Sequence, residues 1–279
     1  MQYYSPSWNA EFYDDIAKYV PNYVPTSKRG TWKGHIDLPK GAIKPIAVLA
    51  QNGVDFQDNV QDTKAYQYWA DVDPRTGNVE IPRVKAGTYR LTVYAEGIFG
   101  QYIEDNVVVS AQKMQTTHAH WREESAGTEI WRIGTPDKSS GEYKHGYAPD
   151  LTHPLHPEQY RIYWAAYDFP TDFPEGVVYK VGESDVAEDF NYIHWSVFGG
   201  YANSVRTEPY YENVNNWTIQ FDLSEQQFDR KRQATFTVQL AGAKTAAGNT
   251  DVFNASEPFA NLPYTVAVNG RDLKPWVIP

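Results

Sequence analysis

The most chemically distinctive stretch of the sequence is a turn-rich loop that collects charged and aromatic side chains. It extends from Trp131 to Gly146 and contains, in order, Asp137, Lys138, Glu142, Tyr143, Lys144 and His145. Aromatic faces stack on the C–H surfaces of sugar rings, while charged groups bind hydroxyls and uronate carboxylates. The loop is therefore a candidate docking site for an acidic glycan. The alternative is that Trp131 and Ile133 are core residues and the loop is ordinary surface.

Two pairs of histidines raise the question of metal ligation. His118 and His120 alternate along an extended segment, so both imidazoles lie on the same side and offer two ligands to a transition metal. No third ligand is evident from the sequence, which favours two ordinary linker histidines and no metal site. His153 and His156 are each followed by proline, and the extended loop that results favours the same interpretation.

Acidic residues offer a second type of cation site. Asp185, Glu188 and Asp189 are close enough in sequence to hold calcium through oxygen ligands, but a solvent-exposed helix face explains them equally well. Asp71 and Asp73 flank a turn and are better explained as turn-forming residues. We therefore expect that no cofactor is required, and structural calcium stays open.

Several functional classes are excluded by what the sequence lacks. The 279 residues include no cysteine, so there is no thiolate nucleophile, disulfide or Cys-ligated zinc. Gly-x-Ser-x-Gly, Gly-x-Gly-x-x-Gly and phosphate-loop motifs are absent. The net charge of −10 argues against a nucleic-acid partner. No apolar run is long enough to cross a membrane.

Three segments position these residues. In the first, residues 1–27, a helix is predicted from Trp8 to Tyr19, with Trp8, Phe12 and Ile16 on one apolar stripe. A single helix cannot bury such a stripe alone, so we expect it to pack on another domain. Residues 28–112 contain six strand-like runs separated by turn signals, which indicates a sandwich of the immunoglobulin or fibronectin type.

The boundary near Gln112 is placed where composition changes. Up to Gln112 the chain has 11 basic and 13 acidic residues, whereas the remainder has 14 and 22. Residues 113–279 are also rich in alternating strand-like runs, among them Tyr160–Tyr167, Trp217–Leu223 and Thr235–Leu240. Their number and length predict a jelly-roll sandwich. The fold class is thus all-β: two sandwich domains preceded by a short helix.

Long runs of the chain resemble the rhamnogalacturonan lyases of polysaccharide lyase family four. They comprise Tyr23–Pro25, Arg29–Gly30, Val48–Asn59, Lys64–Ala70, Ile81–Leu91, Trp131–Asp137, Tyr160–Trp164, Asn191–Phe198 and Asn213–Leu223. The resemblance implies a fibronectin-III-like domain over residues 28–112 and a carbohydrate-binding-like jelly roll over 113–279. It also implies a missing N-terminal catalytic domain, to which the helical linker of residues 1–27 would lead.

The same resemblance implies an activity and a location. The family cleaves the bond between rhamnose and galacturonate in pectin by β-elimination, with catalytic residues in the domain that precedes this chain, so none is assigned here. No signal peptide is visible at Met1, and the initiator methionine before such a segment suggests a fragment. We expect an extracellular protein. We also expect the closing strands of the jelly roll to be missing beyond Pro279, which would leave an exposed edge.

Three functions follow. The first is a non-catalytic portion that binds acidic pectic polysaccharide and accompanies a catalytic domain, in cis or as a separate chain. The second is retained lyase activity, for which Lys144, His145 and Arg161 are the grouping that could neutralise a uronate and move a proton. The third is a purely structural bracing module. The predicted carbohydrate-binding residues are Lys138, Tyr143, Lys144, His145, Arg161 and His194.

Overall fold

The computed structural model of the chain divides into two compact units, Met1–Ser125 and Ala126–Pro279, which we describe separately. The structure describes residues 6–56, 66–125, 127–139, 141–144, 172–192, 217–225, 227, 233–240 and 262–278, and of residues 6–10, 262, 263 and 278 only the backbone. No helix among them is long and apolar enough to cross a membrane.

The first unit begins with a helix. Helix α1 (Pro6–Ile16) continues into a 3-10 turn, η1 (Ala17–Tyr19), in agreement with the predicted helix. A second 3-10 turn, η2 (Thr26–Lys28), leads into the first strand. Asp14 accepts a hydrogen bond from the backbone N–H of Thr26 at 2.9 Å, which ties the helix to the chain that follows it. Phe12 of the predicted apolar stripe remains 52% exposed.

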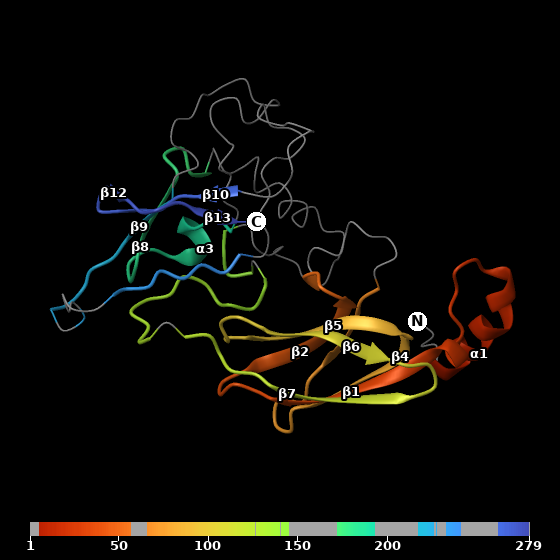
Figure 1. Cartoon of the computed structure of the whole chain (residues 1–279). Helices are drawn as coiled ribbons and strands as arrows, with labels where there is room; N and C mark the ends of the chain where they lie inside the picture. The colour runs from red at the N-terminus through yellow and green to blue at the C-terminus, as the bar shows by residue number, and fades with distance from the viewer. Residues whose placement is uncertain are drawn as a thin grey trace, which may run out of the picture. The chain divides into compact units, whose positions relative to one another are not determined.

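Two sheets face each other in this unit (Figure 1). The three-stranded sheet has the order β4-β1-β7 and the four-stranded sheet the order β3-β2-β5-β6. The strands are β1 (Arg29–Asp37), β2 (Ile43–Gln51), β3 (Tyr68–Asp71), β4 (Asn78–Lys85), β5 (Gly87–Glu96), β6 (Tyr102–Val109) and β7 (Met114–His120). Six of them match the predicted strand runs, and β7 is additional.

Strand β7 follows the predicted boundary at Gln112 and nevertheless pairs in parallel with β1. The backbone N–H of Trp121 also donates to the carbonyl of Asp37 at 3.1 Å, just beyond the end of β7. The first unit therefore extends past Gln112. The polar residues of this segment predict a linker, but the structure forms a strand that buries only Ala119.

The core lies between the two sheets and is built from alternate residues of the facing strands. Trp32 and Ile36 from β1 meet Leu49 from β2 and Leu91 and Val93 from β5, all with 1% or less of their surface exposed. Burial of this kind supplies most of the stabilising free energy of a sandwich.

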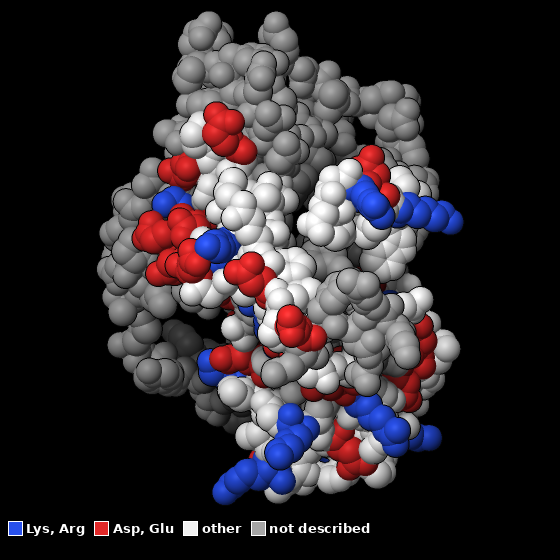
Figure 2. All heavy atoms as spheres, turned by 90° about the vertical axis from the view of Figure 1, so that its left-hand side faces the viewer, with Lys and Arg blue, Asp and Glu red and all other residues white. Residues whose placement is uncertain are grey.

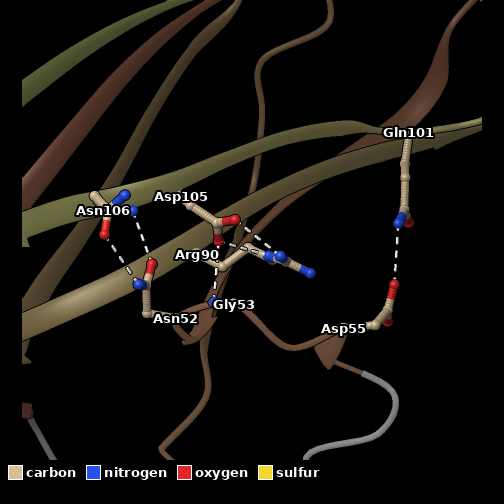
Figure 3. A network of polar contacts seen from close by, with 7 residues as sticks. All are labelled: Asn52, Gly53, Asp55, Arg90, Gln101, Asp105 and Asn106. Atoms are coloured by element: carbon tan, nitrogen blue, oxygen red, sulfur yellow. Dashed lines mark hydrogen bonds and ion pairs between the residues drawn. The ribbon is translucent and has the colours of Figure 1, made fainter.

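A polar network fastens the loop after β2 to strands β5 and β6 (Figure 3). Arg90 donates to both carboxylate oxygens of Asp105, at 2.7 and 2.9 Å, and lowers the pKa of that carboxyl. The same carboxylate accepts from the backbone N–H of Gly53 at 3.0 Å. Asn52 and Asn106 exchange two hydrogen bonds of 3.0 and 2.7 Å. The start of the Val48–Asn59 run is thus held by structural contacts.

The second unit contains a smaller core beside a parallel strand pair. Strand β8 (Val177–Lys180) pairs with β9 (Trp217–Gln220), and helix α3 (Val186–Asp189) lies between them in sequence. Short antiparallel pairs join β10 (Leu262–Tyr264) to β13 (Trp276–Ile278) and β11 (Ala267–Val268) to β12 (Arg271–Asp272). The buried residues of this core are Phe173, Val177, Tyr179 and Phe190.

Two further strands predicted in this unit are not observed among the described residues. The run Tyr160–Tyr167 lies outside the described residues. Residues 235–240 are described but form no strand, so that prediction is wrong; alternation alone does not supply the neighbouring strand that a ladder needs. Phe236 from this run packs instead near Trp131, with ring centroids 6.2 Å apart.

Candidate functional site

The loop singled out in the sequence is anchored at its start by aromatic packing. The ring of Trp131 lies 5.1 Å from that of Phe221, centroid to centroid, and Ile133 packs against the core of the second unit. Ile133 therefore has the core-side role that the sequence left as the alternative, whereas Trp131 is half-buried and packs on rings that are themselves exposed. The packing of Trp131 and Ile133 fixes the start of the loop that carries the charged residues.

Within the loop, carboxylates stabilise the turns. Asp137 accepts from the backbone N–H of Ser139 at 2.7 Å and from its hydroxyl at 2.9 Å. Glu142 accepts from the backbone N–H of Thr135 and so closes the loop across its base. Lys138 stands between Asp137 and Ser139 with a left-handed backbone, φ 61°, and a half-buried side chain. Both acidic residues of the loop thus hold its conformation.

Tyr143 faces the protein interior. Its ring lies 5.6 Å from the ring of Phe190, and its hydroxyl approaches Gly134 so closely that a Cβ there would overlap it. Burial, reinforced by the negative charges of Glu142 and Asp137, raises the pKa of Tyr143 to about 12. A ring in this position supports the loop from below and does not offer an open face for a sugar to stack on.

The position of Tyr143 predicts a dependence of stability on alkaline pH. Its pKa is raised from 10.0 to about 12 by folding, so the folded state holds the proton more tightly. The resulting stability is complete below pH 10 and is lost as the pH rises through 12. The free energy of unfolding of Tyr143→Phe, measured by urea unfolding, should therefore fall less between pH 10 and pH 12 than that of the parent protein. Tyr19→Phe, at a 74% exposed position, is the control and should leave it unchanged; equal slopes in all three proteins would contradict the prediction.

Lys144 is held by a carboxylate. Its Nζ lies 3.2 Å from Oε2 of Glu188, and its backbone N–H donates to the carbonyl of Phe190 at 3.1 Å. The lysine side chain is 23% exposed and the glutamate 73%. An acidic sugar that binds Lys144 must therefore take over the position of an exposed carboxylate.

The acidic cluster around Glu188 has mainly local roles. Asp185 caps helix α3 by accepting from the N–H of Ala187 at 2.9 Å, and Asp189 accepts from the N–H of Asp185 at 2.9 Å. A hollow of about 220 Å³ beside them is lined by Glu188, Asp189, Asp172 and Glu175 together with apolar residues. On the face drawn in Figure 2, the described carboxylates occur in several places, and Lys or Arg side chains lie among or beside most of them.

The remaining predicted binding residues lie outside the described part of the chain. They are His145, Arg161 and His194. The structure thus places Lys138, Tyr143 and Lys144 in one loop with all three half-buried, and the Tyr143 ring packs toward the core of the unit. The sequence did not predict Glu188 as the partner of Lys144, because the two residues are far apart in the chain and no sequence pattern links them.

Family models match both parts of the chain. Residues 39–117 match the family model of polysaccharide lyase family 4, domain II, and residues 129–275 match that of domain III. The chain belongs to polysaccharide lyase family 4. The resemblance noted in the sequence is confirmed, as is the all-β class with fibronectin-like and carbohydrate-binding-like domains.

Curated relatives define the similarity more closely. A probable rhamnogalacturonate lyase C of Aspergillus oryzae is 56% identical over 278 residues, which cover 100% of this chain and 40% of that protein. A probable rhamnogalacturonate lyase C of Emericella nidulans is 58% identical over 278 residues, covering 100% and 26%. Rhamnogalacturonate lyase B of the same organism is 56% identical over 268 residues, covering 96% and 40%. The chain thus spans well under half the length of these relatives.

Proposed function

We propose that this chain is the non-catalytic, pectin-binding portion of a rhamnogalacturonan lyase. The observation that carries the proposal is the match to domains II and III of polysaccharide lyase family 4, in a chain that covers 26 to 40% of its rhamnogalacturonate lyase relatives. The proposed ligand is the acidic backbone of rhamnogalacturonan. The proposed partner is a catalytic domain, in cis or as a separate chain, and the proposed location is extracellular.

The benefit of such a portion is a higher effective concentration of substrate. A binding domain tethered to a catalytic domain converts repeated encounters with a polymer into local ones, and short flexible linkers give effective concentrations in the millimolar range. Because the chain carries a net charge of −10, general electrostatic attraction to a polyuronate is unfavourable. Recognition therefore depends on local cations. The described ones in the Trp131–Gly146 loop are Arg132, which pairs with Glu129 at 2.7 Å, Lys138 and Lys144.

Binding is tested by affinity electrophoresis in gels that contain rhamnogalacturonan. We expect the chain to be retarded, and we expect Lys144→Ala combined with His145→Ala to weaken retention by about tenfold, the value of a lost charged hydrogen bond. Lys180→Ala is the matched control, since Lys180 also pairs with a carboxylate, Glu183, at 2.6 Å on the same unit. The control should migrate like the parent.

Two outcomes would overturn the proposal. Migration of the parent chain without retardation would leave the bracing function as the better explanation. Formation of unsaturated product, seen as a rise in ultraviolet absorbance with rhamnogalacturonan, would favour the retained lyase activity that the names of the relatives suggest. Loss of that rise in the Lys144, His145 and Arg161 variants would then assign the activity to this chain.

A further inference from the structure

A cluster of histidine and aspartate side chains lies on the outer face of the first unit. Strands β1 and β7 run in parallel there, with His35 opposite His118 and Asp37 opposite His120. Ile36 and Ala119, the residues between them, point into the core and are 1% and 0% exposed. The alternation of a strand therefore forces all four polar side chains to the same outer face.

The side chains converge on the carboxylate of Asp37. Oδ2 of Asp37 lies 3.3 Å from Nε2 of His118 and 3.1 Å from Nδ1 of His120. Oδ1 lies 3.7 Å from Nε2 of His35. One ligand atom each from His35, Asp37 and His118 lies within 4.8 Å of the other two, the one such group among the residues that the structure describes.

Neighbouring residues fix which ring nitrogens are free to bind a metal. Nδ1 of His35 lies 2.9 Å from the amide oxygen of Asn78, so that nitrogen carries the proton and Nε2 keeps its lone pair toward Asp37. Nε2 of His120 accepts from Nε of Arg122 at 3.0 Å, so Nδ1 of His120 carries its proton toward Asp37. His120 therefore orients the carboxylate, while His35 presents Nε2 to it and His118 places its own Nε2 3.3 Å from the same carboxylate.

We propose that His35, Asp37 and His118 form a binding site for a divalent transition-metal ion of the zinc type. Two imidazoles and a carboxylate are the donors that Zn²⁺, Cu²⁺ and Ni²⁺ prefer, whereas calcium takes six to eight oxygens. Asn78 and His120 hold the ligands in place from outside, as the outer hydrogen bonds of metal sites generally do. The fourth position faces solvent and is open to water.

The geometry needs only a small contraction to accept an ion. Zinc binds imidazole and carboxylate at about 2.0–2.2 Å in a tetrahedral arrangement, which places ligand atoms about 3.3 Å apart. The side chains are exposed, at 47% for His35, 44% for Asp37 and 66% for His118, so their rotamers can close without disturbing the core. An ion bound there would join β1 to β7, which is the last strand of its sheet, by a link other than backbone hydrogen bonds.

The test is a titration of the untagged, chelator-treated full chain with ZnCl₂, followed by calorimetry and by thermal unfolding. We expect one tight site and a saturable rise in the unfolding temperature of the first unit, since a ligand of the folded state stabilises it. Cobalt provides a direct readout, because Co²⁺ in a tetrahedral site gives an intense visible absorption band. His118→Ala should abolish the band and the stabilisation, and Asn78→Ala should weaken zinc binding about 10- to 100-fold.

A matched control separates this site from the other histidines. His153→Ala combined with His156→Ala also removes imidazoles and should leave zinc binding unchanged. His118→Ala should unfold at the parent temperature in the presence of chelator, which shows that the variant is folded. The proposal is overturned if the parent shows neither band nor stabilisation, if both survive in His118→Ala, or if the control loses them.

Discussion

Replacing Trp32 by alanine should lower the free energy of unfolding of the first unit by about 3–5 kcal/mol, the usual cost of deleting a large core aromatic. Trp32 is 0% exposed at the centre of the sandwich, and its Nε1 donates to the hydroxyl of Thr117 at 3.0 Å. Its ring covers Gly34, where a Cβ would come within 2.6 Å of the indole. Truncation would therefore leave a cavity in the core and would remove the hydrogen-bond donor to the hydroxyl of Thr117 on β7.

Differential scanning calorimetry can measure this effect, because the two units have separate cores. We expect the transition of the first unit to move to a much lower temperature while that of the second unit stays in place. Trp69→Ala is the control: Trp69 is 66% exposed on β3, and its loss should change stability by only about 0.5 kcal/mol. An equal response to both substitutions would show that the assigned core is wrong.

The first unit shows which parts of the fold are predictable from sequence. Alternation of apolar and polar residues located β5, because its inward side chains contact the opposite sheet. The same signal is missing from β7, an edge strand with six of its seven residues exposed or half-buried. β7 forms because it hydrogen-bonds to β1, more than 70 residues earlier in the chain. The spacing of apolar residues within β7 does not predict such a long-range pairing.

The candidate sites divide in the same way. Alternation correctly placed His118 and His120 on one side of a strand. The other two residues of the proposed metal site, His35 and Asp37, come from β1, and only the pairing register of β1 with β7 brings them beside the histidines. Likewise, the composition of the Trp131–Gly146 loop revealed its charge but not which ring is buried. Phe190, distant in sequence, draws Tyr143 inward and leaves the lysines outside.

Phe190→Ala should therefore destabilise the second unit by about 3–5 kcal/mol and abolish the proposed binding of rhamnogalacturonan through loss of structure. The Phe190 ring, 7% exposed, lies 5.6 Å from Tyr143, 5.5 Å from Tyr179 and 4.8 Å from Trp217, so it joins the loop to β8 and β9. Val178→Thr, on the outer side of β8 and 51% exposed, is the control and should change stability by about 0.5 kcal/mol.

Comparing Phe190→Ala with Lys144→Ala distinguishes a residue that stabilises the loop from one that binds the glycan. Lys144 pairs with a glutamate that is 73% exposed to solvent, so removing the lysine should cost the unit less than about 1 kcal/mol while weakening glycan retention. Urea unfolding followed by circular dichroism, run beside affinity electrophoresis, measures both properties for each variant. Loss of retention without loss of stability in Lys144→Ala, and loss of both in Phe190→Ala, is the expected pattern. The reverse pattern would mean that the glycan contacts the aromatic core and that the lysine braces the loop.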